Sequence, residues 1–193
     1  MEKIQRPDLY SLEQYAEIRN EFRSKVMLHK KLRHIELGPN VRLLFEDRMI
    51  MQYQIQEMLR IEKIFEPAGI QEELDAYNPL IPDGSNLKAT MMLEIGDVDE
   101  RKIALEKMLG IEKMTWLGIA DHDKVFPVAN EDMDRETEEK TSSVHFLRFE
   151  LSPEMIISLK NGEGLSAGID HPEYAYKVTV DKGVINALIK DLD

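Results

Sequence analysis

The sequence predicts an α+β fold, in which a largely antiparallel sheet of about seven strands packs against helices. Short stretches with the alternation or the β-branched content of strands recur along the whole chain. Helical stretches interrupt them irregularly, without the strict strand–helix alternation that favours a parallel sheet. One helical stretch is apolar around more than half of its circumference, which is typical of a long, mostly buried helix.

The first half of the chain is expected to hold both helices and strands. Ser11 and Gln14 form a capping box, and apolar residues recur behind it at helical spacing. Gly38-Pro39-Asn40 makes a turn between two alternating stretches, and Pro67-Ala68-Gly69 ends the long helix. In order, we expect a helix over 11–31, strands over 34–37 and 41–45, helices over 47–65 and 70–77, and a strand over 86–95.

The second half is expected to continue this irregular order. Asp97 caps one helix, and Ser152 followed by Pro153 opens another. Asp121-His122-Asp123 is expected at the tip of a hairpin. In order, we expect a helix over 97–109, a hairpin of 113–119 and 124–128, a strand over 143–151, a helix over 153–162, strands over 165–169 and 174–180, and a final helix that begins at 181.

Two stretches carry a strong local charge. The stretch 129–143 is polar and acidic, and we expect it to be a mobile loop or a protruding hairpin. The stretch from His29 to His34 is basic, with Arg23 and Lys25 just before it. Cations favour the C-terminal end of a helix, which explains these residues without a function. The alternative is a patch that binds an anion or docks a partner.

The composition excludes several functional classes. The chain has 193 residues, a formal net charge of −12 and no cysteine. The missing thiols exclude disulfide scaffolds, zinc fingers, Cys-ligated iron–sulfur clusters and thiol catalysis. The negative charge opposes binding to nucleic acid, whose affinity comes from cations on the protein. No apolar run suits a membrane span or a signal peptide, so we expect a single cytoplasmic domain over 1–193, with no membrane.

The long helix places three polar side chains within its apolar arc, namely Gln54, Glu57 and Glu62. The opposite, solvent-facing side carries Gln52, Gln56, Arg60 and Lys63. A carboxylate that is taken out of water needs a partner or a proton. Arg60 and Arg148 are the partners we consider. Three interpretations stay open: a buried ion pair or hydrogen-bond network, a ligand or metal site of Glu57 with Gln54, or exposure at an oligomer interface.

The strand that contains His145 and Arg148 adds two candidates. His145 shares the more apolar face of this strand, and Arg148 lies on the other face. A histidine on an apolar face is either a satisfied core residue or a proton carrier or metal ligand. Asp170, His171 and Glu173 could ligate a metal together with His145, although a proline-containing turn explains the same three residues.

Several segments of the chain together resemble one known family: 38–40 with 43–46, 54–60, 76–82, 143–149 and 170–172. The family is a bacterial one of about this length whose domain has no assigned function, and the resemblance extends over nearly the whole chain. Its members are often encoded beside rubrerythrin-like and iron–sulfur proteins. The resemblance therefore implies a role in redox or peroxide stress, and it implies no activity, cofactor or catalytic residue.

These observations favour an accessory protein that binds a small ligand or a partner protein, or that forms a homo-oligomer. The alternative is a small-molecule hydrolase or lyase, with Glu57 as general base, Arg148 as anion clamp and His145 as proton carrier. That alternative requires Glu57 and His145 to converge on one cleft. A metal-binding protein that uses His145, Asp170, His171 and Glu173 is the third hypothesis. No cofactor is indicated, because the sequence holds no phosphate-binding or catalytic motif.

Overall fold

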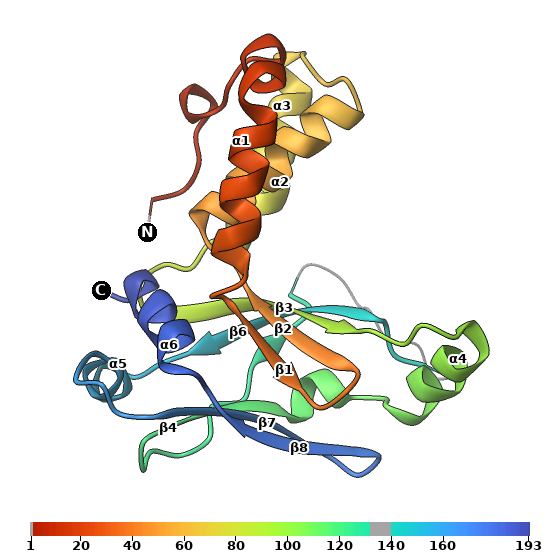
Figure 1. Ribbon diagram of the computed structural model, residues 1–193, viewed down its shortest axis with the longest axis vertical. Coiled ribbons are helices and arrows are strands. Elements are labelled where there is room, and N and C mark those ends of the chain that lie inside the picture. The colour runs from red at the N-terminus through yellow and green to blue at the C-terminus, as the bar shows by residue number, and fades with distance from the viewer. Residues whose placement is uncertain (1, 132–139) are drawn as a thin grey trace.

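The computed structural model describes residues 2–131 and 140–193, which form a β-rich body with a helical arm projecting from it (Figure 1). The arm consists of the helices α1 (Leu12–Lys30), α2 (Arg48–Ile61) and α3 (Pro67–Tyr77). The body holds α4 (Val98–Lys107), α5 (Pro153–Lys160), α6 (Lys182–Leu188) and the strands β1 (His34–Leu37), β2 (Val41–Phe45), β3 (Asn86–Leu93), β4 (Thr115–Ile119), β5 (Val128–Ala129), β6 (Val144–Glu150), β7 (Leu165–His171) and β8 (Tyr174–Thr179).

The strands form two antiparallel sheets. One has the order β1-β2-β3-β6-β5, and the other has the order β4-β7-β8. Buried side chains of both sheets belong to one hydrophobic core, to which the first sheet contributes Leu43 and Met91 and the second contributes Leu117 and Ile169. The predicted α+β fold is therefore confirmed. Its strands are divided between two sheets that pack face to face.

The pleat of β3 and β6 decides which side chains point away from this core. Buried and partly exposed residues alternate along both strands. Lys88 and Thr90 of β3 lie on the outer face of the five-stranded sheet, together with Phe146 and Arg148 of β6. The register pairs Lys88 with Arg148 and Thr90 with Phe146. Four side chains of mixed chemistry thus form one patch on this outer face.

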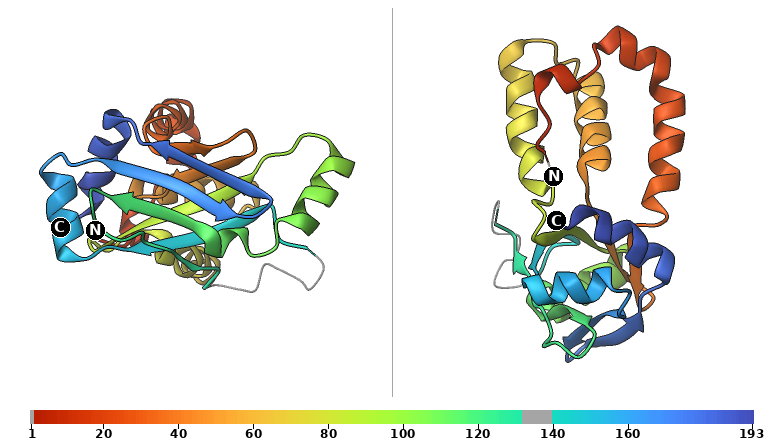
Figure 2. Two further views of the ribbon diagram at one scale, coloured as in Figure 1. Left: turned by 90° about the horizontal axis from the view of Figure 1, so that it is seen from below. Right: turned by 90° about the vertical axis from the view of Figure 1, so that its left-hand side faces the viewer.

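The arm has a hydrophobic core of its own. α2 lies between α1 and α3 (Figure 2), and Phe22 of α1 makes edge contacts with Tyr15 and Tyr53. The chain passes between arm and body at 31–33, 46–47 and 78–85. A single domain stays a prediction, since two separate cores are present. The core of the arm is formed by Ile4, Ile50, Met51, Ile55, Leu59, Leu74 and Ile81.

The predicted end of α2 is wrong by four residues. The helix ends at Ile61 because Lys63 adopts a left-handed φ of 56°. The amide of Ile64 then donates to the carbonyl of Leu59 at 2.9 Å, which is the hydrogen bond of a Schellman C-cap. The side chains of α2 include both buried and partly exposed positions, so the helix lies against α1 and α3 and keeps a solvent-facing edge.

The predicted hairpin of 113–119 and 124–128 is wrong, because its two segments share only a single bridge. Val125 forms a bridge with Leu117, but β5 then pairs with β6. Pro127 lacks the N–H that a longer ladder with β4 would need. Within the predicted acidic loop, residues 132–139 lie outside the described residues. No helix of the described residues has the length and apolar character to cross a membrane.

Candidate functional site

Glu57 lies in the arm, where α1 supplies its partners. Nε and Nη2 of Arg19 each donate to a different carboxylate oxygen at 2.7 Å, and the hydroxyl of Tyr15 donates at 2.8 Å. Arg60 adds an ion contact at 3.6 Å. The hydrogen bonds from Arg19 hold the pKa of Glu57 below its usual range. The partner is therefore Arg19 rather than Arg148, and the carboxylate links two helices.

The neighbouring glutamines do not follow the predicted helical faces. Gln56 is fully buried, although its position predicted a solvent-facing side chain, whereas Gln54 is only partly buried. The backbone of Tyr10 folds back over α2 and satisfies Gln56. The amide oxygen of Gln56 accepts from the Tyr10 N–H at 2.7 Å, and its amide nitrogen lies 3.4 Å from the Tyr10 carbonyl. The prediction for Gln56 was wrong because this cover comes from a distant segment.

His145 lies in the body with no exposed surface. Its Nδ1 is 3.0 Å from the side-chain nitrogen of Asn130, and its Nε2 is 3.0 Å from both the Ser142 carbonyl and the Thr141 hydroxyl. The side-chain oxygen of Asn130 accepts the N–H of Phe146, so its NH₂ group donates to Nδ1. This pattern assigns the ring proton to Nε2, which donates to the Ser142 carbonyl. His145 has the hydrogen bonds of a satisfied core residue.

Glu112 is the unexpected neighbour of His145. Its Oε2 lies 4.0 Å from Nδ1 of the histidine, and the ammonium of Lys113 lies 3.7 Å from Oε1. Within the described part of the chain, neither oxygen of this fully buried carboxylate has a hydrogen-bond donor. Among the described residues, the contacts of Glu57 all lie in the arm, whereas His145 lies beside Glu112 in the body. The geometry required by the predicted hydrolase or lyase site is not formed.

The residues considered for a metal site also have separate partners. Asp170 accepts from the ammonium of Lys124 at 2.6 Å, and Nε2 of His171 is 3.0 Å from the carbonyl of Leu109. Glu173 is exposed and donates its backbone N–H to His171. None of them joins His145. Across residues 2–131 and 140–193, no group of three or more His, Asp or Glu residues could hold a metal ion.

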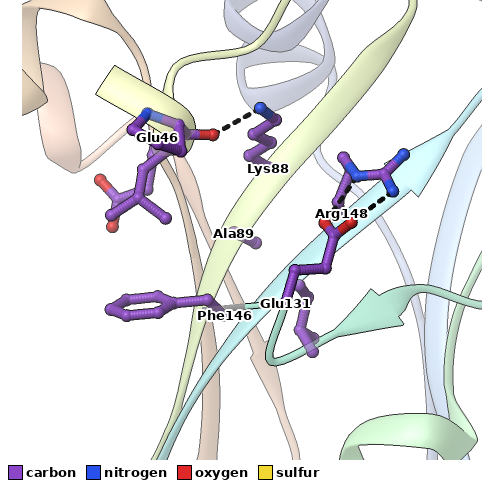
Figure 3. A pocket seen from close by; sticks show the side chains of 9 residues that line it. Glu46, Lys88, Ala89, Glu131, Phe146 and Arg148 are labelled. Carbon is purple, nitrogen blue, oxygen red and sulfur yellow. Dashed lines mark hydrogen bonds and ion pairs between the residues drawn. The ribbon is translucent and has the colours of Figure 1, made fainter. Parts of the chain in front are cut away.

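A small pocket lies where the outer face of the five-stranded sheet meets the connection from α3 to β3 (Figure 3). We call it the outer-face pocket, and its volume is about 70 Å³. Lys88 and Arg148 line it from adjacent strands, Glu46 from the β2–α2 connection, and Glu131 from the segment after β5. Its remaining lining is supplied by Pro79, Leu80, Ala89, Phe146 and Leu147.

The backbone holds Glu46 at the edge of this pocket. Its N–H donates to the Lys88 carbonyl at 2.8 Å, and its carbonyl accepts from Arg33 at 3.1 Å. The Thr90 hydroxyl donates to Oε1 at 2.5 Å, whereas the buried Oε2 has no hydrogen-bond donor among the described residues. Burial raises the pKa of Glu46 to about 7. The group therefore gains and loses a proton near neutral pH.

The two cations of the pocket are held differently. Nε and Nη2 of Arg148 donate to the two oxygens of Glu131 at 2.7 Å, and Nη1 donates to Glu150. These carboxylates raise the pKa of Arg148 and neutralise its charge. The ammonium of Lys88 donates to the Pro79 carbonyl at 2.5 Å. Burial lowers the pKa of Lys88, and the charge of Arg148 lowers it further.

A sequence model of one family matches residues 3–192 of the chain, and that family is described as protein of unknown function, DUF3501. The chain belongs to this family. A solved structure is similar to the chain, with 48% sequence identity and a TM-score of 0.95. It is described as a novel protein of unknown function from Burkholderia pseudomallei K96243. The match covers 100% of both chains. No curated protein matches the sequence.

The resemblance to a family of unknown function is thus confirmed, whereas the redox link implied by gene neighbours stays a prediction. Of the charged residues that line the outer-face pocket, the sequence pointed to Arg148 as a candidate but did not point to Glu46, Lys88 or Glu131. The alternation of β3 could have placed Lys88 beside Arg148 if the strand pairing had been known. Nothing in the sequence around Glu46 shows that Pro79 and Leu80 line the same pocket, because these two residues lie more than thirty positions further along the chain.

Proposed function

We propose that this DUF3501 protein binds a small molecule in the outer-face pocket. The observation that supports the proposal is the Oε2 atom of Glu46, which is buried, has no hydrogen-bond donor in the part of the chain that the structure describes, and belongs to a residue that lines a cavity. Leaving such a group unsatisfied costs about 1–3 kcal/mol. A ligand that donates an N–H or O–H to this oxygen recovers that free energy, so the site favours donors over acceptors.

The remaining walls narrow the chemistry of the ligand. Arg148 already binds two carboxylates, so it does not provide a strong anion site. Leu80, Ala89 and Phe146 offer apolar surface beside the polar groups. A cavity of about 70 Å³ holds a group of only a few non-hydrogen atoms. We therefore infer a small polar molecule with a donor at one end and a compact apolar part.

Protein-observed NMR, which follows the backbone amide signals of the chain, tests this proposal with a set of small amides, amines, alcohols and carbonyl compounds. Binders should shift the backbone amide signals of Lys88, Ala89 and Phe146. Glu46→Leu, which removes both oxygens while filling similar space, should weaken binding at least about tenfold, corresponding to about 1.4 kcal/mol. Glu94→Leu is the control, because Glu94 is an exposed residue just beyond the end of β3. Binding that survives Glu46→Leu, or no binding by any compound, contradicts the proposal.

Self-association is a second candidate function, favoured by a groove at the far end of the arm. The groove has a volume of about 330 Å³, and Leu9, Leu12 and Ile70 are among the side chains that line it. The side chain of Phe65, which also lines it, is 68% exposed. A protruding aromatic ring beside an apolar groove is self-complementary, as a two-fold interface between identical chains requires. The rim carries Arg6 and Glu13, which pair with opposite charges across such an axis.

Sedimentation velocity over a range of protein concentrations tests this second candidate. The wild-type chain should form a dimer, and Phe65→Ser should shift it to the monomer. Phe126→Ser is a matched control, because Phe126 is an exposed ring in the body, remote in sequence from the arm. A wild-type protein that is monomeric at every concentration, or a Phe65→Ser variant that still dimerises, rules out this interface.

A further inference from the structure

A second pocket lies at the base of the arm, where α1 ends, α2 begins and the C-terminal segment of the chain passes. Figures 1 and 2 show α6 beside the end of α1 at this place. We call it the junction pocket, and its volume is about 280 Å³. Its lining and that of the outer-face pocket are formed by different residues. The titratable side chains that line the junction pocket are His29, Arg33, Asp47, Arg48, Lys190 and Asp191.

Arg33 holds the walls of the junction pocket together. Its guanidinium forms a buried ion pair with Asp191, and its Nε lies 3.5 Å from the carboxylate of Asp47. Arg48 follows Asp47 in the chain, and Lys190 precedes Asp191. The two contacts of Arg33 therefore bring two further cations, from distant parts of the chain, to one cavity.

Both carboxylates of the junction pocket are engaged. Asp191 pairs with Arg33, and Asp47 has Nε2 of His29 as a partner in addition to Arg33. A carboxylate only accepts hydrogen bonds, so Nε2 carries a proton and Nδ1 is the ring nitrogen that is left for another partner. Nδ1 has no hydrogen bond to any described residue, and the side chain of His29 is 29% exposed. A ligand in the pocket therefore has access to this ring.

Two cations of the pocket keep donors that the protein does not use. The ammonium of Lys190 has no ion pair or hydrogen bond within the described part of the chain. Arg48 donates from Nη2 to Asp8 at 2.8 Å, and its Nε and Nη1 have no partner among residues 2–131 and 140–193. With Arg33, three permanent cations thus stand against two carboxylates. This small cavity has an excess of positive charge in a chain whose formal net charge is −12.

The arrangement of these donors favours a phosphate group over a carboxylate. Lys190, Arg48 and His29 come from three separate segments and surround one cavity. A phosphate group presents three terminal oxygens and close to two negative charges, so it can accept from several donors at once. A carboxylate has only two oxygens and a single charge. The volume also leaves space for a short organic group, for which the exposed side chain of Leu32 offers apolar surface.

We propose that the junction pocket binds the phosphate group of a small molecule. Lys190 and Arg48 donate to its oxygens, and His29 adds Nδ1 when the ring carries both protons. Arg33 remains an internal clamp, because its donors are all used within the protein. The site gives a function to the part of the basic stretch that lines the pocket. It is independent of the ligand proposed for the outer-face pocket.

A phosphate titration followed by NMR tests the proposal on the full chain at constant pH. About 0.15 M salt screens the attraction between distant exposed charges. Inorganic phosphate should shift the ring signals of His29 until they saturate. It should not shift those of His34, which belongs to the same basic stretch but does not line the pocket. The proposal is overturned if His29 shows no saturable shift, if both histidines shift equally, or if acetate binds as tightly as phosphate.

Two lysines of the C-terminal segment provide matched variants. Lys190 lines the pocket, whereas Lys182 is an exposed residue at the start of α6 that does not. Lys190→Gln should weaken phosphate binding at least about tenfold, because a charge-assisted hydrogen bond is lost. Lys182→Gln removes the same charge and should leave the affinity unchanged. Equal weakening in the two variants would reveal attraction to the overall charge of the segment and would refute the site.

A parallel titration with glycerol 3-phosphate distinguishes the two sources of a phosphate group. Tighter binding of this ester than of inorganic phosphate supports the site and assigns it to an organic phosphate. Equal or weaker binding of the ester supports the site and assigns it to free phosphate. If neither compound binds while small amides still shift the signals of Lys88 and Ala89, the junction site is refuted and the function proposed for the outer-face pocket stands.

Discussion

Arg33 and Asp191 form an ion pair in which both side chains are buried. The pair joins the base of the arm to the C-terminal part of the body. Arg33 also donates to the backbone carbonyls of Phe45, Glu46 and Ala187. One guanidinium therefore holds the end of β2, the start of the β2–α2 connection and the last helix together. The same contact fixes the carbonyl of Glu46 and so positions one wall of the outer-face pocket.

Arg33→Met should destabilise the fold strongly. The substitution leaves the carboxylate of Asp191 buried without its cation, and breaking such a pair costs about 3–5 kcal/mol. Urea unfolding measures this difference. Arg42→Met is the control, because Arg42 pairs with Glu36 at the surface, where an ion pair contributes less than about 1 kcal/mol. Similar losses in the two variants would show that Arg33 has no special role.

The stability of the wild-type chain should fall as the pH rises from about 4.5 to about 7, and Glu46→Gln should reduce this fall. Burial raises the pKa of Glu46 from 4.5 to about 7, so the folded state binds the proton more tightly than the unfolded state. The stabilisation is complete below the unfolded pKa and is lost as the pH passes the folded pKa. The shift corresponds to at most about 3 kcal/mol. Urea unfolding at several pH values, with Glu94→Gln as control, should show a flatter profile for Glu46→Gln alone.

Arg19→Met should loosen the arm without affecting the body. Arg19 supplies two of the three side-chain donors to Glu57, and these bonds connect α1 to α2. Hydrogen exchange followed by mass spectrometry should show several-fold faster exchange for amides of α1, with β3 and β6 unchanged. Arg23→Met, an exposed change on the same helix, serves for comparison. Equal exchange rates of the α1 amides in the two variants would contradict the role of the Arg19–Glu57 pair in holding α1 against α2.

Gly168→Ala should destabilise the three-stranded sheet and alter the fluorescence of the single tryptophan. A Cβ at this position would clash with the Trp116 ring and lie 2.7 Å from the Tyr176 carbonyl, closer than real contacts allow. We expect a loss of about 1–3 kcal/mol, typical of overpacking. Gly96→Ala is the matched control, since its Cβ would meet nothing within 4 Å. Thermal unfolding with Trp116 emission as the signal measures both variants.

The order of elements could be predicted because its signals are local. The alternation of β6 identified the buried face of His145 and the outer face of Arg148, and the Ser11 capping box marked the start of α1. Which strands pair with each other was harder to predict from the sequence. Val125 contacts β4, but the next strand joins β6, and that choice depends on the rest of the sheet.

The outer-face pocket could not be predicted because its walls come from separate segments. Glu46 shares a pocket with Pro79 and Leu80 only once the connection from α3 to β3 is in place, and Gln56 gains its hydrogen-bond partner only once Tyr10 lies against α2. Helical periodicity describes one helix against an averaged environment, so it assigned Gln56 to solvent. Glu57 shows that periodicity also cannot identify a partner that lies on another helix. Its need for a partner was correct, but Arg19 could be chosen over Arg148 only once α1 was placed beside α2.

The position of α2 and α3 in the chain has a consequence for engineering. They occupy the connection between β2 and β3, which are adjacent antiparallel strands that a tight turn of two residues could otherwise join. The ladder between these strands uses no atom of the inserted helices. Residues 62–66 at the far tip can therefore accept a fluorescent tag or a longer linker while every strand keeps its neighbour.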